Sequence, residues 1–289
     1  MNKGILILSL FLLIIMSYLA HANDNTEVIR YFAGYSKGSS CYWMNDQKIE
    51  LDSNSIANSI YIDNKDIYIA GVRKGMACYW LNGNIIELDS NGTANSIIKY
   101  NSDIYVVGSK QGTACYWHNT KRIDLDSNSE ALSIFIDNTE IYIAGYKQGT
   151  ACYWKNNTRI DLDSNGKANY ITKYGSDLYI AGYKRGTACY WKNDKRIDLE
   201  SNGGINSIYI DQSGIYFAGY VKGSACYWHN DKLSKLDSNA EANSIIKSNN
   251  DIYIVGYKQG KACYWLNGKR VDLDSNSGIN SIAIKSNMP

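Results

Sequence analysis

The stretch EIYIAGYKQGTACYWKNNTRIDLD, residues 140–163, contains the pattern that decides the fold, because close copies of it recur along the chain. Its Cys-Tyr-Trp triplet occurs seven times at intervals of 37 residues, and these triplets contain all seven cysteines and all seven tryptophans of the 289 residues. A fixed period of about 20 to 50 residues is typical of a repeat architecture, in which each repeat is one supersecondary unit. The repeats are centred on Cys41, Cys78, Cys115, Cys152, Cys189, Cys226 and Cys263.

Within one repeat, the hydrophobic pattern predicts four short strands, which we name A to D in chain order. In the fourth copy, strand A covers residues 133–137, strand B 140–146, strand C 150–154 and strand D 159–163. Asn follows strand C in every copy, and Asn tolerates the positive φ angles that two-residue hairpin turns need. Strand B is apolar on both faces, whereas strand D alternates apolar residues with aspartates. We therefore expect strand D at the outer rim and strand A innermost.

The two ends of the repeat array predict a closed ring. The array begins with a strand B at residues 27–34 and ends with a lone strand A at residues 280–284, which would complete the first repeat. An open array would need polar capping repeats, and the sequence has none. The predicted fold class is therefore all-β, a seven-bladed β-propeller with four antiparallel strands per blade and a first blade closed by the C-terminal strand. In this fold the D–A and B–C loops share one end of the ring.

The first 22 residues have the features of a signal peptide. Lys3 gives a basic start, an apolar run follows from residue 5 to residue 15, and Ala20-His21-Ala22 fits a small-x-small cleavage site. The apolar run is too short for a comfortable membrane span. We expect residues 1–22 to be removed on export and residues 23–289 to form a single propeller domain without a membrane span. The expected location is secreted, periplasmic or at the cell surface.

Charge and cysteine usage narrow the possible partners. The chain has 30 Lys and Arg against 28 Asp and Glu, a balance that gives no electrostatic basis for binding nucleic acid. Disulfides are not expected, because the number of cysteines is odd and each repeat holds one equivalent cysteine. Equivalent atoms of stacked sheets lie ~10 Å apart or more, whereas a disulfide needs Cα atoms within ~7 Å. We expect free, buried thiols and a monomeric protein.

The B–C loops contain the candidate ligand-binding residues. An aromatic residue followed by a cation recurs there in several copies, and such pairs, repeated around a ring, could form pockets for sugars or anionic ligands. The alternative is a solvated hairpin with a tyrosine packed at its base. The candidate residues are Tyr146, Lys147, Tyr183, Lys184, Arg185, Tyr257 and Lys258.

The D–A loop resembles the start of a calcium-binding loop. Asp161, Asp163 and Asn165 have the Asp-x-Asp-x-Asn spacing, followed by Gly166. The later ligands of such a loop do not follow, and a polar turn with Asx hydrogen bonds explains the same residues. Calcium at these three positions therefore remains an alternative, and no other cofactor is expected.

No catalytic residues are predicted. Beyond the predicted signal peptide the chain has two histidines, His118 and His229, at equivalent positions where other copies have Met, Leu or Lys. A single active site must break the sevenfold symmetry. The breaks, at Leu132, Tyr170, Val221 and the Leu233-Ser-Lys235 stretch, form no acid–base or nucleophile arrangement. An enzyme is therefore not expected.

The segments at residues 141–146 and 151–156, with their equivalents across residues 27–285, resemble a known type of tandem repeat. Exported bacterial proteins carry such units, with the pattern Tyr-Val-Ala-Gly-Tyr followed by Ala-Cys-Tyr-Trp-Lys-Asn-Gly. The resemblance implies a propeller and a bacterial origin. It supplies no known catalytic or binding residues that could be assigned to this chain.

The sequence leads to one main hypothesis about function and to its alternatives. The main hypothesis is an exported, non-enzymatic binding or interaction module with seven similar loop sites, whose ligand is a glycan or a protein. Its most specific form is a multivalent lectin, because repeated sites convert weak single-site affinity into avidity. The alternatives are a calcium-binding propeller and a purely structural surface propeller. A hydrolase or lyase with one asymmetric active site is less favoured.

Overall fold

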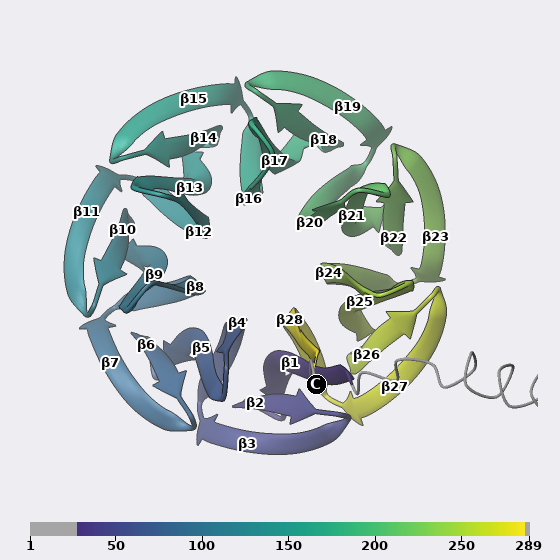
Figure 1. Cartoon of the computed structure of the whole chain (residues 1–289), viewed down its shortest axis with the longest axis horizontal. Helices are drawn as coiled ribbons and strands as arrows, with labels where there is room; N and C mark the ends of the chain where they lie inside the picture. Colours follow the sequence, from purple (N-terminus) through teal and green to yellow (C-terminus); the bar gives the residue numbers. More distant parts are fainter. Residues whose placement is uncertain (1–27, 287–289) are drawn as a thin grey trace, which may run out of the picture. The chain divides into compact units, whose positions relative to one another are not determined.

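The computed structural model describes residues 28–286, and the predicted signal peptide, residues 1–22, lies outside the described residues. Seven four-stranded antiparallel sheets form a ring in residues 30–284 (Figure 1). Strand β28 pairs with β1, so the C-terminal strand completes the first sheet. Both features confirm the predicted seven-bladed β-propeller. Within the described part of the chain, no helix has the length and apolar character needed to cross a membrane.

We number the blades in the order of their Cys-Tyr-Trp triplets, and in each blade the strands run from A inside to D outside. Blade 1 consists of β28 (Ser277–Ser286), β1 (Val28–Ser36), β2 (Ser39–Met44) and β3 (Gln47–Ser53); blade 2 of β4 (Ser55–Asp63), β5 (Asp66–Arg73), β6 (Met76–Leu81) and β7 (Asn84–Ser90); blade 3 of β8 (Gly92–Tyr100), β9 (Asp103–Lys110), β10 (Thr113–His118) and β11 (Lys121–Ser127); blade 4 of β12 (Ser129–Asp137), β13 (Glu140–Lys147), β14 (Thr150–Lys155) and β15 (Thr158–Ser164); blade 5 of β16 (Gly166–Tyr174), β17 (Asp177–Lys184), β18 (Thr187–Lys192) and β19 (Lys195–Ser201); blade 6 of β20 (Gly203–Asp211), β21 (Gly214–Val221), β22 (Ser224–His229) and β23 (Lys232–Ser238); and blade 7 of β24 (Ala240–Ser248), β25 (Asp251–Lys258), β26 (Lys261–Leu266) and β27 (Lys269–Ser275).

The Asn that follows strand C has two roles in the fold. Asn156 and Asn157 have φ angles of 49° and 69°, as a two-residue hairpin turn between β14 and β15 requires. The Asn156 side-chain oxygen also accepts a hydrogen bond from the Ile141 N–H at 2.9 Å, and the Asn156 N–H donates to the Ile141 carbonyl at 2.9 Å. The side-chain bond recurs in all seven blades, so this Asn fastens each outer hairpin to strand B.

The Gly of strand B permits a close approach of two strands. In blade 4 the pairing of β12 with β13 shifts register at Leu132, which produces a bulge opposite Gly145. A Cβ atom on Gly145 would lie 2.0 Å from the carbonyl oxygen of Glu130, so no larger residue fits there. This glycine lies inside strand β13.

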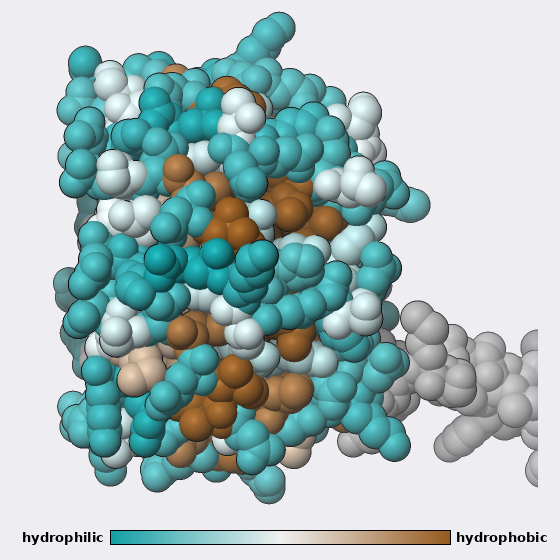
Figure 2. All heavy atoms as spheres, turned by 90° about the vertical axis from the view of Figure 1, so that its left-hand side faces the viewer, coloured by the Kyte–Doolittle hydropathy of each residue, from teal (hydrophilic) through white to brown (hydrophobic). Residues whose placement is uncertain are grey.

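The core lies between neighbouring blades, and the Cys-Tyr-Trp triplets supply much of it. All seven tryptophans are at most 1% exposed. At the boundary of blades 3 and 4, Trp154 and Cys152 of β14 pack with Val107 and Tyr116 of the preceding blade. The outer wall near β11 is hydrophilic with apolar patches between the polar bands (Figure 2). Leu125 of β11 is one of the partly buried residues packed against this core.

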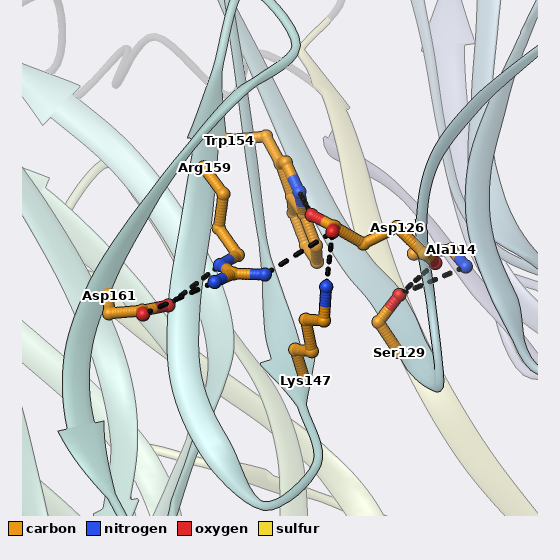
Figure 3. Close-up of polar contacts among 7 residues, drawn as sticks. All are labelled: Ala114, Asp126, Ser129, Lys147, Trp154, Arg159 and Asp161. Atoms are coloured by element: carbon orange, nitrogen blue, oxygen red, sulfur yellow. Dashed lines mark hydrogen bonds and ion pairs between the residues drawn. The ribbon is translucent and has the colours of Figure 1, made fainter.

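An aspartate at the end of strand D connects each blade to the next. Asp126 of blade 3 accepts a hydrogen bond from the Trp154 indole N–H of blade 4 at 2.8 Å (Figure 3). The same carboxylate pairs with Lys147 and with Arg159, whose guanidinium lies 3.2 Å away and also binds Asp161 of its own strand at 2.8 Å. We call this group of a carboxylate, an indole and one or two cations the blade-boundary cluster.

Six of the seven boundaries hold the aspartate–indole bond of this cluster. The donor and acceptor pairs are Trp43 with Asp274, Trp80 with Asp52, Trp117 with Asp89, Trp154 with Asp126, Trp191 with Asp163, and Trp265 with Asp237. The exception is the boundary of blades 5 and 6, where Glu200, Val221 and Leu233 replace the aspartate and both cations. There the buried indole N–H of Trp228 has no hydrogen-bond partner among the described residues.

Neighbouring blades also alternate in a second pattern, which repeats every two blades. Near the end of strand A, blades 2, 4 and 6 carry Ile followed by Asp, whereas blades 3, 5 and 7 carry Lys at the first of these positions. Each Lys forms an ion pair with the Asp of the preceding blade. The pairs are Asp63 with Lys99, Asp137 with Lys173, and Asp211 with Lys247.

We expect the blade-boundary cluster to stabilise the folded protein. Asp126→Ala leaves the indole of Trp154 and two cations without their acceptor, which should cost ~2 kcal/mol and lower Tm by roughly 4–8 °C in calorimetry. Glu200→Ala is the matched control, because its boundary has no such cluster, and it should change Tm by less than about 2 °C. Equal effects of the two substitutions would contradict the role assigned to the cluster.

The same carboxylates predict how stability depends on pH. Burial opposes their ionisation, but hydrogen bonds from Lys and Trp and the charge of Arg lower the pKa values of Asp89, Asp126, Asp163 and Asp237 below the ordinary 3.8. A carboxyl group whose pKa is depressed by folding stabilises the protein above its unfolded-state pKa and loses that contribution as the pH falls through the folded-state value. Tm should therefore be level above about pH 5 and fall steeply below about pH 4. In a scan of Tm against pH, Asp126→Asn should shrink this acid-induced fall.

Candidate functional site

The D–A and B–C turns lie together on one face of the ring, which we call the loop face. The Gln148 N–H of a B–C turn donates to the Asn128 carbonyl at 3.0 Å, and the Gly166 N–H donates to the Gly149 carbonyl at 2.9 Å. Each such B–C turn is thereby held between two successive D–A turns. Equivalent bonds recur around the ring, so backbone hydrogen bonds hold the loops of this face in place.

The lysines predicted to bind a ligand form ion pairs with aspartates at the blade boundaries. Lys147, Lys184 and Lys258 form ion pairs with Asp126, Asp163 and Asp237 of the preceding blades. Their side chains are about one quarter exposed, and each shares its aspartate with an arginine and an indole. The paired aspartates compensate the positive charge that would attract an anionic ligand.

The tyrosines predicted to bind a ligand lie on strand B at the edge of the loop face. Tyr146, Tyr183 and Tyr257 pair with residues at the start of strand A, and Tyr35 and Tyr220 occupy the same position in their blades. All five are partly exposed. Because they come from the successive blades 4, 5, 6, 7 and 1, they form an interrupted ring that we call the tyrosine arc.

Two glutamates support the tyrosine arc. Glu130 accepts a hydrogen bond from the Tyr146 hydroxyl at 2.8 Å and another from the Asn95 amide at 3.0 Å. Glu241 accepts from the Tyr257 hydroxyl at 3.0 Å. Burial, together with the Glu130 hydrogen bond and charge, raises the pKa of Tyr146 to about 12. The Tyr146 phenol is therefore neutral near pH 7.

The arc is interrupted at blades 2 and 3, where Val72 and Ser109 replace the tyrosine. Beside this gap the loop face has a hollow of about 470 Å³, lined by Tyr35, Ile56 and Val72 together with residues of the neighbouring turns. Ile56 is 45% exposed, the largest exposed fraction among the large hydrophobic residues of the described chain. Sequence reasoning missed this hollow, although an Ile where other blades carry Thr, Glu, Lys or Gly was visible in the alignment of the repeats.

Arg185 lies in the B–C turn of blade 5, next to the arc. Its φ angle is 48°, and the following Gly186 has a φ of 73°, so the two residues form a tight hairpin turn. The residue is exposed, and its N–H donates to the Asn165 carbonyl at 2.7 Å. The backbone is thus fixed while the side chain faces solvent near Tyr183.

The three residues of the calcium alternative have different contacts in the structure. Asp163 accepts from Trp191 at 2.9 Å and pairs with Arg196 at 2.7 Å, whereas Asp161 pairs with Arg159 at 2.8 Å. Asn165 is the left-handed residue of the D–A turn, with a φ angle of 55°. The two carboxylates therefore point to different cations of the protein. Among residues 28–286 no group of three acidic, His or Cys side chains is arranged to hold a metal ion.

Both histidines lie against a tyrosine of strand B. His118 stacks on Tyr105 with ring centroids 4.5 Å apart, and His229 stacks on Tyr216 at 4.3 Å. In blade 4 the equivalent Lys155 lies over the Tyr142 ring at 5.4 Å. A His or a Lys at this position therefore covers the aromatic ring of strand B.

All seven cysteines are free and buried within the blades. Burial raises the pKa of six of the thiols to about 12 and also raises that of Cys226. The thiolate is the nucleophilic and metal-binding form of cysteine, so these groups are chemically unreactive in the folded protein.

Comparisons with known proteins identify the fold. No protein-family model matches the chain, and no curated protein matches it. Among solved structures, a suggested 6-phosphogluconolactonase from Bacteroides uniformis is similar with a TM-score of 0.61 and 8% identity, covering 90% of this chain and 100% of that one. Apo AztD from Citrobacter koseri has a TM-score of 0.52 and 8% identity, covering 89% and 98%. The extracellular domain of a hybrid two-component system from B. thetaiotaomicron has a TM-score of 0.52 and 8% identity over 73% of this chain, which spans only 32% of that protein. Such low identity shows a shared fold alone.

The burial of the thiols predicts their reactivity. Iodoacetamide at pH 8 should leave the native protein unlabelled, because a thiol with a pKa of about 12 is almost entirely protonated there. After unfolding in guanidinium chloride, all seven cysteines should react. Intact-mass spectrometry before and after unfolding counts the labels. Rapid labelling of native protein, or fewer labels after unfolding without reductant, would contradict the buried free thiols.

Proposed function

We propose that this protein is an exported binding module that works without catalysis and takes its ligand at the tyrosine arc of the loop face. The observation that supports this most directly is the arc itself, five partly exposed tyrosines from five successive blades. Aromatic rings with a hydroxyl group combine a large apolar area with a polar group, which is why they are favoured in binding sites. The seven-bladed fold supports a binding or structural module, and the arc favours binding.

The ligand class that fits the arc is a neutral glycan. Aspartates compensate the charges of Lys147, Lys184 and Lys258 beside the arc, and the Tyr146 phenol keeps its proton near pH 7. The carboxylates of Glu130 and Glu241 next to the arc can accept hydrogen bonds from sugar hydroxyl groups and would repel acidic ligands. Repetition of the tyrosine in successive blades suits a ligand with repeated units, so we propose a multivalent lectin.

Two further observations support the absence of catalysis and the exported location. The two histidines stack on tyrosines at positions that a Lys or Leu fills in other blades, so neither is needed as an acid or base. The pattern of residues 1–22 is that of a signal peptide, and buried free thiols are protected from oxidation outside the cytoplasm.

A glycan array tests the proposal. We expect the protein to bind neutral glycans more strongly than sialylated or sulfated ones. Tyr183→Ala should weaken binding by about tenfold, because removal of a central aromatic contact in a binding site costs more than 1 kcal/mol. Arg185→Ala should weaken it by roughly threefold, as expected for a contact at the rim of the site.

The control is Tyr174→Ala. Tyr174 is 43% exposed and lies at the A–B end of blade 5, opposite the loop face, so its removal should leave glycan binding unchanged. Equal losses for Tyr174→Ala and Tyr183→Ala would contradict a site at the arc. Absence of a signal for any glycan would exclude the lectin and leave a protein ligand, which pull-down with the same variants can address.

A further inference from the structure

The inner strands of the blades enclose a channel with two layers. The layer nearer the loop face is a polar belt with a hollow of about 130 Å³. The belt is lined by Asn and Ser residues, with Leu132 in place of one Asn and Tyr170 in place of one Ser. Six Asn side chains of strand A each donate a hydrogen bond to a backbone carbonyl of the next blade, for example Asn58 to Ala94 at 3.0 Å and Asn280 to Ala57 at 2.9 Å. These bonds connect the inner strands of neighbouring blades everywhere except from blade 4 to blade 5, because blade 4 carries Leu132 at the Asn position.

Below the belt, toward the A–B hairpins, the channel widens into a chamber of about 430 Å³. Its wall consists of the inner strands β4, β8, β12, β16, β20, β24 and β28, seen end-on around the centre of the ring in Figure 1. At one level the wall alternates between aromatic residues in blades 2, 4 and 6 and smaller residues in blades 3, 5 and 7. These residues are Tyr61, Phe135 and Tyr209, and Ile98, Thr172 and Ile246.

Blade 1 contributes Ala283 at this level, the smallest side chain of the seven. The chamber is therefore asymmetric, with most room on the side of β28. A volume of about 430 Å³ lies within the range of about 300–1,000 Å³ that small-molecule sites occupy.

The chamber contains no acidic or basic side chain among its lining residues. The charged residues at the end of strand A pair with each other between blades, as Lys99 does with Asp63 at 2.6 Å and Lys247 with Asp211 at 2.8 Å. A charged ligand entering this space would lose its hydration without gaining a counter-ion, which costs several kcal/mol. The site therefore selects against ions of both signs.

The chamber nevertheless offers hydrogen bonds to an uncharged ligand. Strand A is the last strand of every sheet, so its inner edge presents backbone N–H and C=O groups to the channel. Tyr170 replaces the belt serine in blade 5 and lines both layers, so it brings a phenol hydroxyl to this part of the channel. Burial raises the pKa of this phenol, so it acts as a neutral donor and acceptor at the junction of belt and chamber.

We propose that the chamber is a second binding site, separate from the loop face, for a neutral small molecule that combines a hydrocarbon part with one or two uncharged hydrogen-bonding groups. The hydrocarbon part contacts the aromatic and aliphatic wall, and the polar group reaches Tyr170 and the belt. The proposal does not rest on the glycan site, because none of the tyrosines of the arc lines the chamber.

Binding is tested with the full-length mature chain and N-phenyl-1-naphthylamine, an uncharged probe that fluoresces in apolar surroundings. We expect saturable fluorescence that titrates to one site per chain. Displacement by three eight-carbon compounds then tests the charge rule. 1-Octanol should displace the probe at least tenfold more effectively than octanoate or octylammonium at pH 7.

Three variants, one of them a control, locate the site. Ala283→Phe fills the widest part of the chamber with the residue that blade 4 carries at the equivalent position, Phe135, and it should weaken probe binding at least tenfold without lowering Tm. Thr158→Phe makes a similar enlargement at an exposed position of the rim strand β15 and should have no effect. Tyr170→Phe should weaken 1-octanol about 2- to 12-fold, the effect of one lost neutral hydrogen bond of 0.5–1.5 kcal/mol, and leave hexylbenzene unaffected.

Three outcomes would overturn the proposal. The first is the absence of saturable probe fluorescence. The second is unchanged probe binding in Ala283→Phe, which would place the probe elsewhere, for example in the hollow beside Ile56. The third is equal displacement by the neutral and the ionic compounds. Loss of glycan binding in Tyr183→Ala with normal probe binding would separate the two sites, and failure of either site leaves the other untouched.

Discussion

The ring depends on a carboxylate that one blade contributes to the next. Asp126 and its equivalents accept a hydrogen bond from the indole N–H of the following blade and form ion pairs with one or two of its cations. The buried indole donor therefore has its acceptor on the other side of the boundary. The apolar packing of tryptophan and tyrosine between blades is non-directional and would allow the sheets to slide or tilt. A hydrogen bond from a fully buried indole has a defined direction, and an unsatisfied one is costly. The carboxylate therefore fixes the register of neighbouring blades, which packing alone leaves loose. Trp228 shows that six such bonds suffice, because its own boundary holds without one.

Much of the fold could be predicted from the sequence, and the reasons are physical. Four strands per repeat follow from the alternation of apolar and polar residues, and the turns follow from Asn and Gly at positions of positive φ. Ring closure followed from the split first repeat, because a lone strand A has its partner at the other end of the chain. The role of Gly145 could not be predicted, because it depends on a bulge in the neighbouring strand and not on a turn.

The candidate site was predicted less well, because partners across a blade boundary are not neighbours in the repeat. Lys147 looked available for a ligand, but its aspartate lies 21 residues earlier, in the preceding blade. One signal existed, since Trp and Asp keep a constant separation of 28 residues in five copies, and a shared interval of this kind suggests a contact. The tyrosines were named from the sequence in three blades, but their continuity through blades 6 and 1 is apparent only when the blades are placed around the ring. The chamber could not be predicted from any single repeat, because strand A of all seven blades forms its wall.

The alternation between neighbouring blades repeats every two blades, whereas the ring has seven blades. Blades 2, 4 and 6 provide an Asp that the Lys of blades 3, 5 and 7 pairs with, so the effective unit of the pattern is a pair of blades. A pattern of period two cannot run without fault around a ring with an odd number of members. The fault falls at blade 1 and its junction with blade 2, where Ile284 and Ile62 occupy the same position. Ile284 is followed by Lys285 and not by Asp, so blade 1 has no partner in the pattern. The hollow beside Ile56 and the end of the tyrosine arc lie at that same junction. The odd number of blades thereby makes blade 1 distinguishable within a ring of near-identical parts, and a partner that recognises this position can bind the ring in a single orientation.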